Sequence, residues 1–196
     1  VPILYGLTIG EYAKMINGEK WLNNNIQAKL TVIKMDNYNR EFEYQLKSKP
    51  SPNLPNLKSI NLYPSLCFFE QTPVSVGRGT EMQFQVIGSP NWNNQPFSFT
   101  PRPNFGAKNP KHNGIKCFGL DLRHEKKLSK INLEWLIKAY NYSPEKEKFF
   151  RSGFYRLAGT KKLENQIKAG MSAEEIKSTW KKDIESYMII RNKYML

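Results

Sequence analysis

The sequence predicts an α+β fold, with a mixed sheet, flanking helices and a helical C-terminal third. Segments with strand-like and helix-like patterns share the chain, but they lack the regular βαβ alternation of a doubly wound parallel sheet. Apolar residues make up 39% and charged residues 24% of 196 residues, fractions typical of a globular domain. The length suits a single domain over 1–196. No apolar run is long enough for a membrane-spanning helix.

The first expected element is a helix over residues 8–17. Thr8 and Glu11 have the spacing of a capping box, in which each side chain accepts a hydrogen bond from the backbone of the other residue. Gly18 follows as a C-terminal stop.

Two strands are expected next. Apolar and polar residues alternate over 28–35, which predicts a strand, and a weaker pattern over 40–46 predicts another. The turn-forming residues 36–39 separate them. Three prolines within 49–55 exclude helix and central strand, so this segment is expected to be a stiff extended loop.

A second helix is expected over 57–63, with Asn56 as its N-cap and Pro64 as its end. The apolar run 66–69 should be buried. Shorter patterns then predict the strands of the sheet. These strands are expected at 83–88, 97–100 and 115–123.

The last third predicts helices over 131–142, 160–168 and 173–190, with a break at Gly170. Ser172 and Glu175 form a second capping box. An apolar stripe at helical spacing is expected to face the core. Its members are Ile176, Trp180, Ile184 and Tyr187.

Composition leaves several kinds of partner open. The net charge is +13, which suits nucleic acid, an anionic membrane surface or an anionic polysaccharide, but is equally typical of a lysine-rich composition bias. Cys67 and Cys117 are expected to be buried free thiols, and no Cys or His spacing indicates a metal site. His112 and His124 are expected on the surface. Nucleotide-binding and hydrolase fingerprints are absent, so no cofactor is predicted.

The most informative stretch runs from Glu70 to Thr80. Glu70 follows a buried Phe-Phe pair, and an apolar setting raises a carboxyl pKa toward that of a general acid. Arg78 lies between two glycines, where its planar guanidinium can bind a carboxylate or a phosphate. A purely structural ion pair between Glu70 and Arg78 stays open as the alternative. The neighbouring candidate ligands are Thr72, Ser75, Gly79 and Thr80.

A second candidate is the asparagine-rich loop 89–94, which contains Trp92. An indole in a polar loop suits stacking on a sugar ring or a base. The alternative is that Trp92 folds back onto the core. Ser51 and Asn53, in the proline-rich loop, are candidate cleft residues, and a structural role for that loop is the alternative.

Several motifs stand in one order along the chain. Tyr5–Glu11, Pro50–Pro55, Leu62–Pro64, Glu70–Thr80 and Phe84–Gly88 are followed by Gly170, Ser172, Glu175, Trp180 and Arg191 near the end. This set resembles the C-terminal half of the exo-β-N-acetylmuramidase (NamZ-type) family, over nearly all of the chain.

The resemblance implies a glycoside hydrolase that releases terminal N-acetylmuramic acid from the non-reducing end of peptidoglycan fragments. It implies a Rossmann-like N-terminal domain absent from this chain, with the cleft between the two halves and the principal catalytic glutamate in the absent half, so the fragment alone is expected to be inactive. Arg78 would bind the lactyl carboxylate and Glu70 would be a second carboxylate or would position Arg78. A periplasmic or cell-surface location is expected.

Two other functions stay open. One is a non-catalytic module that binds cell-wall glycan. The other is a nucleic-acid-binding domain, which only the net charge favours and which the scattered lysines and few arginines disfavour.

Overall fold

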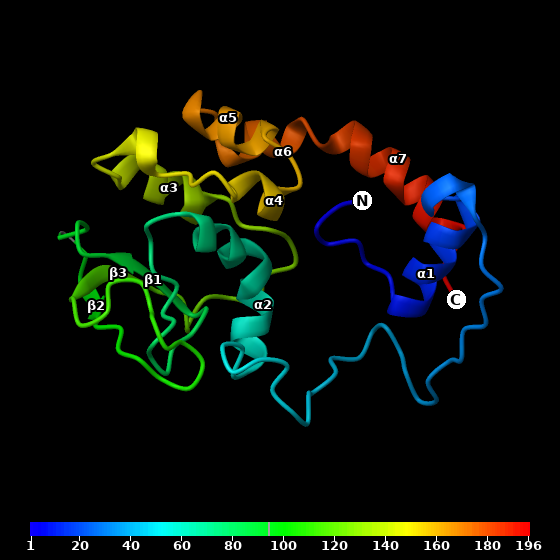
Figure 1. Cartoon of the computed structure of the whole chain (residues 1–196), viewed down its shortest axis with the longest axis horizontal. Helices are drawn as coiled ribbons and strands as arrows, with labels where there is room; N and C mark the ends of the chain where they lie inside the picture. The colour runs from blue at the N-terminus through cyan, green and yellow to red at the C-terminus, as the bar shows by residue number, and fades with distance from the viewer. Residues whose placement is uncertain (94) are drawn as a thin grey trace. The chain divides into compact units, whose positions relative to one another are not determined.

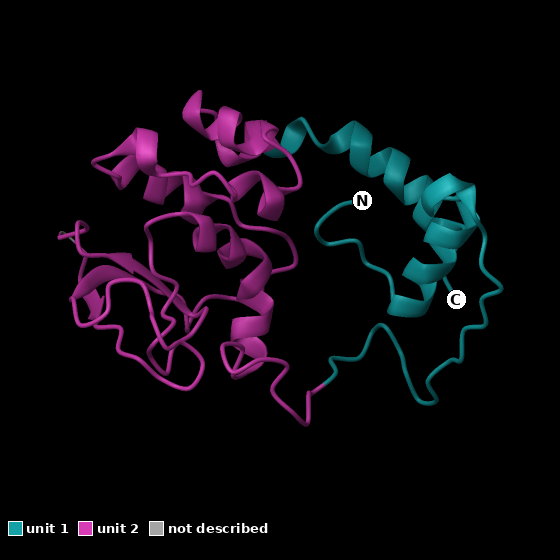
Figure 2. Ribbon diagram, viewed as in Figure 1, with its two compact units in different colours: residues 1–44, 177–196 teal, residues 45–176 magenta. Residues whose placement is uncertain are grey.

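The computed structural model describes residues 1–93 and 95–196 (Figure 1). The chain divides into two units, one of residues 1–44 and 177–196 and the other of residues 45–176 (Figure 2). The two units are groups of residues that pack mainly among themselves, which does not test whether they are separate domains. The prediction of one domain over 1–196 therefore stays a prediction. The described residues form helices and one small antiparallel sheet, which confirms the α+β class. No helix in the described part of the chain has the length and apolarity needed to cross a membrane.

The first unit is built on two helices, α1 (Ile9–Gly18) and α7 (Lys181–Asn192). The predicted capping box of α1 is present, because Thr8 and Glu11 each accept a hydrogen bond from the other's backbone amide. Leu7, Met15 and Tyr187 form a small apolar core between the two ends of the chain.

The two strands predicted in this unit are not formed. Apart from turns, residues 26–46 carry no regular structure, and the short 3₁₀ turn η1 (Asn23–Asn25) precedes them. A strand needs a neighbour to satisfy its backbone, and no described residue pairs with 28–35 or 40–46. The strand prediction is therefore wrong for this chain.

The second unit begins with α2 (Leu57–Leu66), capped by Asn56 as predicted. Pro64 lies inside this helix rather than ending it, which corrects the predicted boundary. A proline so close to a helix end removes a single hydrogen bond, and the chain continues directly into the 3₁₀ segment η2 (Cys67–Gln71). The apolar run 66–69 is buried, as predicted.

The sheet has three antiparallel strands, β1 (Val86–Ser89), β2 (Phe97–Phe99) and β3 (Cys117–Asp121), in the order β1-β3-β2. The strands predicted at 97–100 and 115–123 are confirmed in shorter form. The strand predicted at 83–88 is shifted, because residues 83–85 form a turn and β1 ends at Ser89. Gly88 pairs with Gly119, and a Cβ at Gly119 would lie 1.8 Å from the carbonyl oxygen of Ile87. Only glycine permits this approach.

An aromatic core joins the sheet-proximal helices of this unit. Phe149 and Phe150 pack against Tyr140, and Phe150 contacts Phe154 at 4.5 Å between ring centroids. The helices that contribute to this region or follow it are α3 (Glu134–Tyr142), η3 (Lys146–Lys148), α4 (Phe154–Ala158), α5 (Lys162–Lys168) and α6 (Ala173–Ser178). The sequence predicted α3 and α5 but missed η3 and α4, which are too short for a periodic pattern. Both cysteines are free and buried, as predicted.

The expected helix over 173–190 is split into α6 and α7 by a turn at Thr179 and Trp180. The apolar stripe is therefore divided. Ile176 and Tyr187 are buried, but Ile184 is 41% exposed, so the prediction that the whole stripe faces a core is wrong. A break in the helix changes the angular phase of every later side chain, and sequence spacing cannot register it.

Candidate functional site

The candidate site lies where η2 meets the loop that follows it. Glu70 is in the last turn of η2, and Arg78 is in a tight turn between two left-handed glycines. Arg78 Nη1 donates to Glu70 Oε1 at 2.6 Å. The side chains are 42% and 27% exposed, respectively, so the pair lies at the surface of its unit and a ligand can reach it. Among the described residues, Glu70 is the one group that bonds the guanidinium, which leaves Arg78 several N–H donors for a ligand.

Gly79 fixes the turn that presents Arg78. Its φ is +83°, and a Cβ there would lie 2.7 Å from both the carbonyl oxygen of Arg102 and the ring of Pro110. The Arg102 amide also donates to the carbonyl of Gly79 at 2.8 Å. A side chain at this position would displace the turn from Arg102 and Pro110, so glycine is required here by the backbone geometry. The role of Gly79 in binding substrate stays a prediction.

Lys111 supports the opposite side of the same segment. Its Nζ lies within 3.3 Å of four backbone carbonyl oxygens, to which it donates from beneath the segment; these belong to Phe69, Glu70, Thr72 and Val74. Burial lowers the pKa of Lys111 to about 7, and the nearby positive charge of Arg151 acts in the same direction. Lys111 therefore anchors the segment that carries Glu70.

Further charged and aromatic groups surround the pair. The backbone amide of Arg151 donates to the carbonyl of Gln71 at 2.9 Å. Burial raises the pKa of the Tyr63 hydroxyl, and the negative charge of Glu70 raises it further. Glu70 pairs with Arg78, and the charges of Glu70, Arg78 and Arg151 all act on Lys111. The two arginines outnumber the one carboxylate, and this excess of positive charge favours an anionic ligand.

The predicted hydroxyl ligands bond to the backbone around Arg78. Thr72 donates to the carbonyl of Phe69 at 2.9 Å, and Thr80 donates to that of Gly77 at 2.7 Å. Ser75 accepts from the amide of Gly77 at 3.3 Å. Thr72 and Ser75 are buried, and all three side chains shape the loop. Their role as sugar ligands stays a prediction.

Ser51 and Asn53 stabilise the proline-rich loop. Ser51 Oγ accepts from the amide of Asn53 at 3.2 Å, and Asn53 Nδ2 donates to the carbonyl of Gly106 at 2.7 Å. The same turn reaches the Arg78 loop, because Asn104 Nδ2 donates to the carbonyl of Thr80 at 3.4 Å. The structure therefore connects these two residues to the site through the turn at 104–107, and their place in a cleft stays a prediction.

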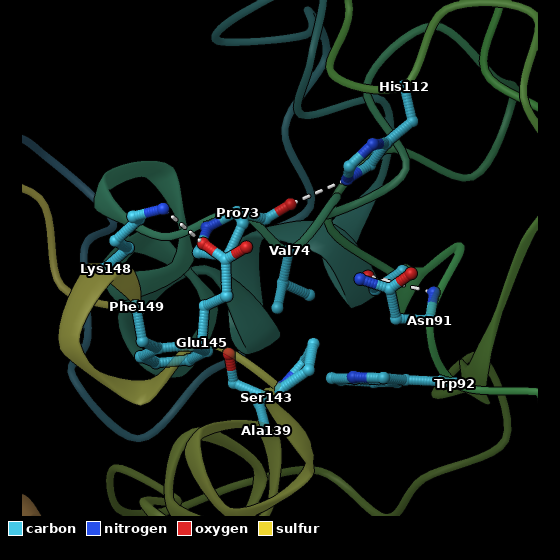
Figure 3. Close-up of a pocket in the computed structure, with 12 residues that line it drawn as sticks. Pro73, Val74, Asn91, Trp92, His112, Ala139, Ser143, Glu145, Lys148 and Phe149 are labelled. Carbon is cyan, nitrogen blue, oxygen red and sulfur yellow. Dashed lines mark hydrogen bonds and ion pairs between the residues drawn. The ribbon is translucent and has the colours of Figure 1, made fainter.

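A cavity of about 220 Å³ borders the other end of the segment (Figure 3). Trp92 is 5% exposed and forms one wall, with its ring edge-to-face against Tyr142 at 5.9 Å. It is folded into its unit rather than projecting from the loop, yet it still faces a space of monosaccharide size. The polar lining residues are Ser89, Asn91, His112, Ser143, Glu145 and Lys148. Asn94, at the end of the predicted loop, lies outside the described residues.

His112 corrects a prediction. The sequence predicted an exposed surface histidine, but His112 is half-buried, lines the cavity and lies 2.7 Å by its Nε2 from the carbonyl oxygen of Pro73. A carbonyl only accepts, so Nε2 carries the proton in this bond. His124 is exposed, as predicted.

Sequence reasoning thus found the Glu70–Thr80 loop and Trp92 but missed Lys111, His112 and Arg151. The first two lie in a loop whose composition indicates only a turn, and nothing local marks them as bonded to carbonyls some forty residues earlier. Within residues 1–93 and 95–196, no cluster of three or more His, Cys, Asp or Glu side chains suits a metal ion.

Comparison with known proteins places this geometry in a family. The family model described as the C-terminal part of the exo-β-N-acetylmuramidase NamZ matches residues 61–196, and the model of its N-terminal part matches residues 1–58. The chain belongs to the NamZ family. The resemblance read from the sequence is therefore confirmed.

Individual relatives agree with this assignment. The chain is 31% identical to the peptidoglycan β-N-acetylmuramidase NamZ of Bacillus subtilis (strain 168), over 100% of the chain and 51% of that protein. The chain therefore spans about half the length of this NamZ relative.

Two crystal structures of DUF1343 family proteins from Bacteroides fragilis NCTC 9343 are also similar. The first has 46% identity and a TM-score of 0.93, and the second has 23% identity and a TM-score of 0.74. Each comparison covers 100% of this chain and 57% of the other.

Proposed function

We propose that this chain is part of a glycoside hydrolase that acts on peptidoglycan and releases terminal N-acetylmuramic acid from the non-reducing end of its fragments. Membership of the NamZ family and the similarity to the Bacillus subtilis enzyme support the substrate class. In this proposal the chain supplies part of the substrate-binding cleft, the preceding half supplies the principal catalytic carboxyl, and the chain alone is inactive.

The observation that carries the proposal is the Glu70–Arg78 pair in its cationic surroundings. N-acetylmuramic acid differs from N-acetylglucosamine by a lactyl ether that bears a carboxylate. Arg78 keeps N–H donors open beside its bond to Glu70, and an Arg fork matches a carboxylate in geometry and charge. The charge of Arg151 acts on Lys111, which bonds the backbone carbonyl of Glu70, and so adds positive potential near the pair. In this proposal Arg78 binds the lactyl carboxylate and so selects N-acetylmuramic acid over N-acetylglucosamine.

Glu70 completes this assignment. Glycoside hydrolysis ordinarily uses two carboxyl groups on either side of the scissile bond. Glu70 is bonded to Arg78 and partly open to solvent, so it serves either as the second carboxyl group or as the group that orients Arg78. The proposed setting of the reaction is the periplasm or the cell surface, where peptidoglycan fragments occur.

The test is release of a chromophore from an aryl β-N-acetylmuraminide, with the corresponding glucosaminide as the control substrate. It is run on this chain and on the longer gene product that carries the preceding half. We expect turnover of the muraminide by the longer product alone. Absence of turnover by both proteins would contradict the proposal.

The cavity at Trp92 favours one alternative, a glycan-binding module without catalysis. Its indole wall and its amide, hydroxyl and imidazole lining suit a single pyranose ring. This alternative predicts saturable binding of N-acetylmuramic acid to the longer product, measured by calorimetry, with no turnover of either aryl substrate.

A further inference from the structure

Residues 26–46 expose an unusual amount of apolar surface. The segment runs without helix or strand (Figure 1). Ile33 is 90% exposed and Phe42 is 74% exposed. The large apolar side chains on its surface are Ile26, Leu30, Ile33, Met35, Tyr38, Phe42, Tyr44 and Leu46. Monomeric proteins seldom leave so many apolar groups together in water, so this surface indicates an interaction site.

The segment is held in place along its length by α1. Asn17 makes two hydrogen bonds with the backbone of Ala28, at 2.7 and 2.9 Å. Val32 packs on the helix backbone, because a Cβ added at Gly10 would lie 2.5 Å from Val32 Cγ1. Farther along, Arg40 forms an ion pair with the buried Glu11. Its extended course is therefore fixed from one side while its other side is uncovered.

The exposed side chains have the period of a β-strand. Phe42, Tyr44 and Leu46 alternate with polar residues, which gives one apolar and one polar face. In the earlier stretch Val32 faces α1, whereas Ile33 and Met35 are exposed. Apolar residues on both faces are typical of a strand inside a sheet that is covered on both sides.

The backbone of the earlier stretch is also unpaired. In the described part of the chain, no hydrogen bond involves the amides or carbonyls of residues 29–35. An extended segment with open backbone groups on both edges is a template for further strands. A neighbour that supplies strands would satisfy the backbone and cover the apolar side chains at once.

We propose that, in the whole protein, residues 28–35 and 40–46 are strands of a β-sheet whose other strands come from the polypeptide preceding residue 1. The family's N-terminal model matches residues 1–58, so this segment belongs with the N-terminal part of the family. The relatives extend well beyond the chain, which covers 51% of one and 57% of another. The proposal depends on family membership and not on the proposed activity.

Hydrogen–deuterium exchange tests it directly. Amides 29–35 and 44–46 should exchange within seconds in this chain and at least ~100-fold more slowly in the longer gene product, because ladder hydrogen bonds protect amides. Equal exchange in both proteins would overturn the proposal. Protection that appears in this chain alone as its concentration rises would identify a second copy as the occupant and would also overturn it.

A variant pair gives an independent measurement. Phe42→Asp should leave the Tm of this chain unchanged, since the side chain is already in water, and should lower the Tm of the longer product by several degrees. Gln45→Asp, on the opposite face, is the matched control and should change neither Tm. A Phe42→Asp effect of equal size in both proteins, or in neither, would contradict the proposal. Neither experiment measures turnover, so failure of the proposed activity is distinguishable.

Discussion

The carboxylate of Glu70 and the guanidinium of Arg78 lie 2.6 Å apart, although a loop with two left-handed glycines separates them. Lys111 donates hydrogen bonds to the backbone carbonyls of Phe69 and Thr72, on either side of Glu70. The backbone that carries Glu70 is therefore held in place independently of the ion pair. A surface ion pair contributes little stability, so we propose that the geometry that Lys111 supports serves binding.

Replacing Arg78 with Ala should reduce the preference of the longer product for the aryl muraminide over the glucosaminide by about 10- to 100-fold. A hydrogen bond to a charged group contributes about 1.5–3 kcal/mol, which corresponds to that range. The ratio of the two kcat/KM values measures it. Arg102→Ala removes an equal charge from a neighbouring exposed position and should leave the ratio unchanged. An unchanged ratio in Arg78→Ala would eliminate the lactyl-binding role.

Replacing Glu70 with Gln should lower turnover of the muraminide while changing the free energy of unfolding by less than about 1 kcal/mol. The ion pair is partly exposed, so its loss changes the free energy of unfolding little. Turnover should fall because the variant lacks either the second carboxyl group or the group that orients Arg78. Steady-state kinetics and urea unfolding are compared in the same preparation. Glu81→Gln, in the exposed part of the same loop, is the control. Full activity of Glu70→Gln would leave Glu70 with no role in the site.

Lys111 predicts a rise of stability with pH. Its pKa is about 7 in the folded state, and an unperturbed lysine has a pKa near 10.4, so the unfolded chain holds this proton more tightly between those values. The free energy of unfolding therefore increases as pH rises above about 7. Urea unfolding between about pH 7 and 8.5 measures the slope as the difference between wild type and Lys111→Met, so that titration of the cysteine thiols, whose ordinary pKa is near 8.5, is common to both proteins.

Lys111→Met should remove this slope, and should lower stability by about 1–3 kcal/mol because buried carbonyls lose their donor. Lys108→Met, at an exposed position nearby, should retain the slope. Retention of the slope in Lys111→Met would show that another group causes it.

Glu11 predicts acid sensitivity of the first unit. Burial acts to raise the pKa of this carboxyl, but hydrogen bonds from Arg40 and from the amides of Thr8 and Leu196 lower it to about 2. An unfolded glutamate has a pKa near 4.3, so this stabilisation is present above that pH and is lost as pH falls toward 2.

Glu11→Gln should lower the free energy of unfolding at pH 7 by about 2 kcal/mol and flatten its decline between about pH 4.5 and 2. Chemical unfolding at a series of pH values tests this. The exposed Glu41→Gln is the control. A parallel decline in wild type and Glu11→Gln would refute the assignment.

Local signals predicted most of the fold. The capping residues Thr8 and Asn56 and the strand patterns around Val86 and Cys117 act through neighbours in sequence, so the residues alone reveal them. The errors arise where the outcome depends on distant partners. Residues 28–35 have the period of a strand, but a strand forms only beside another strand, and sequence period does not say where that partner lies.

The same reasoning applies to the site. Glu70, Arg78 and Gly79 are adjacent along one loop, and their chemistry was predictable from spacing. Lys111 and His112 join them by long-range bonds to backbone carbonyls, which leave no trace in the local sequence. Backbone acceptors are present at every residue, so the choice of acceptor is made by tertiary structure.

The exposed apolar face of residues 26–46 bears on the order in which the protein is made. Synthesis runs from the N-terminus, so a preceding sheet would leave the ribosome and fold before these residues emerge, and each new strand would meet a finished template. A chain produced without that template carries the alternating segment Phe42–Leu46 uncovered from the start. Uncovered segments of this kind pair with copies of themselves, so we expect this half to aggregate when it is expressed separately. In the whole protein, earlier synthesis of the preceding sheet would protect the segment from such pairing.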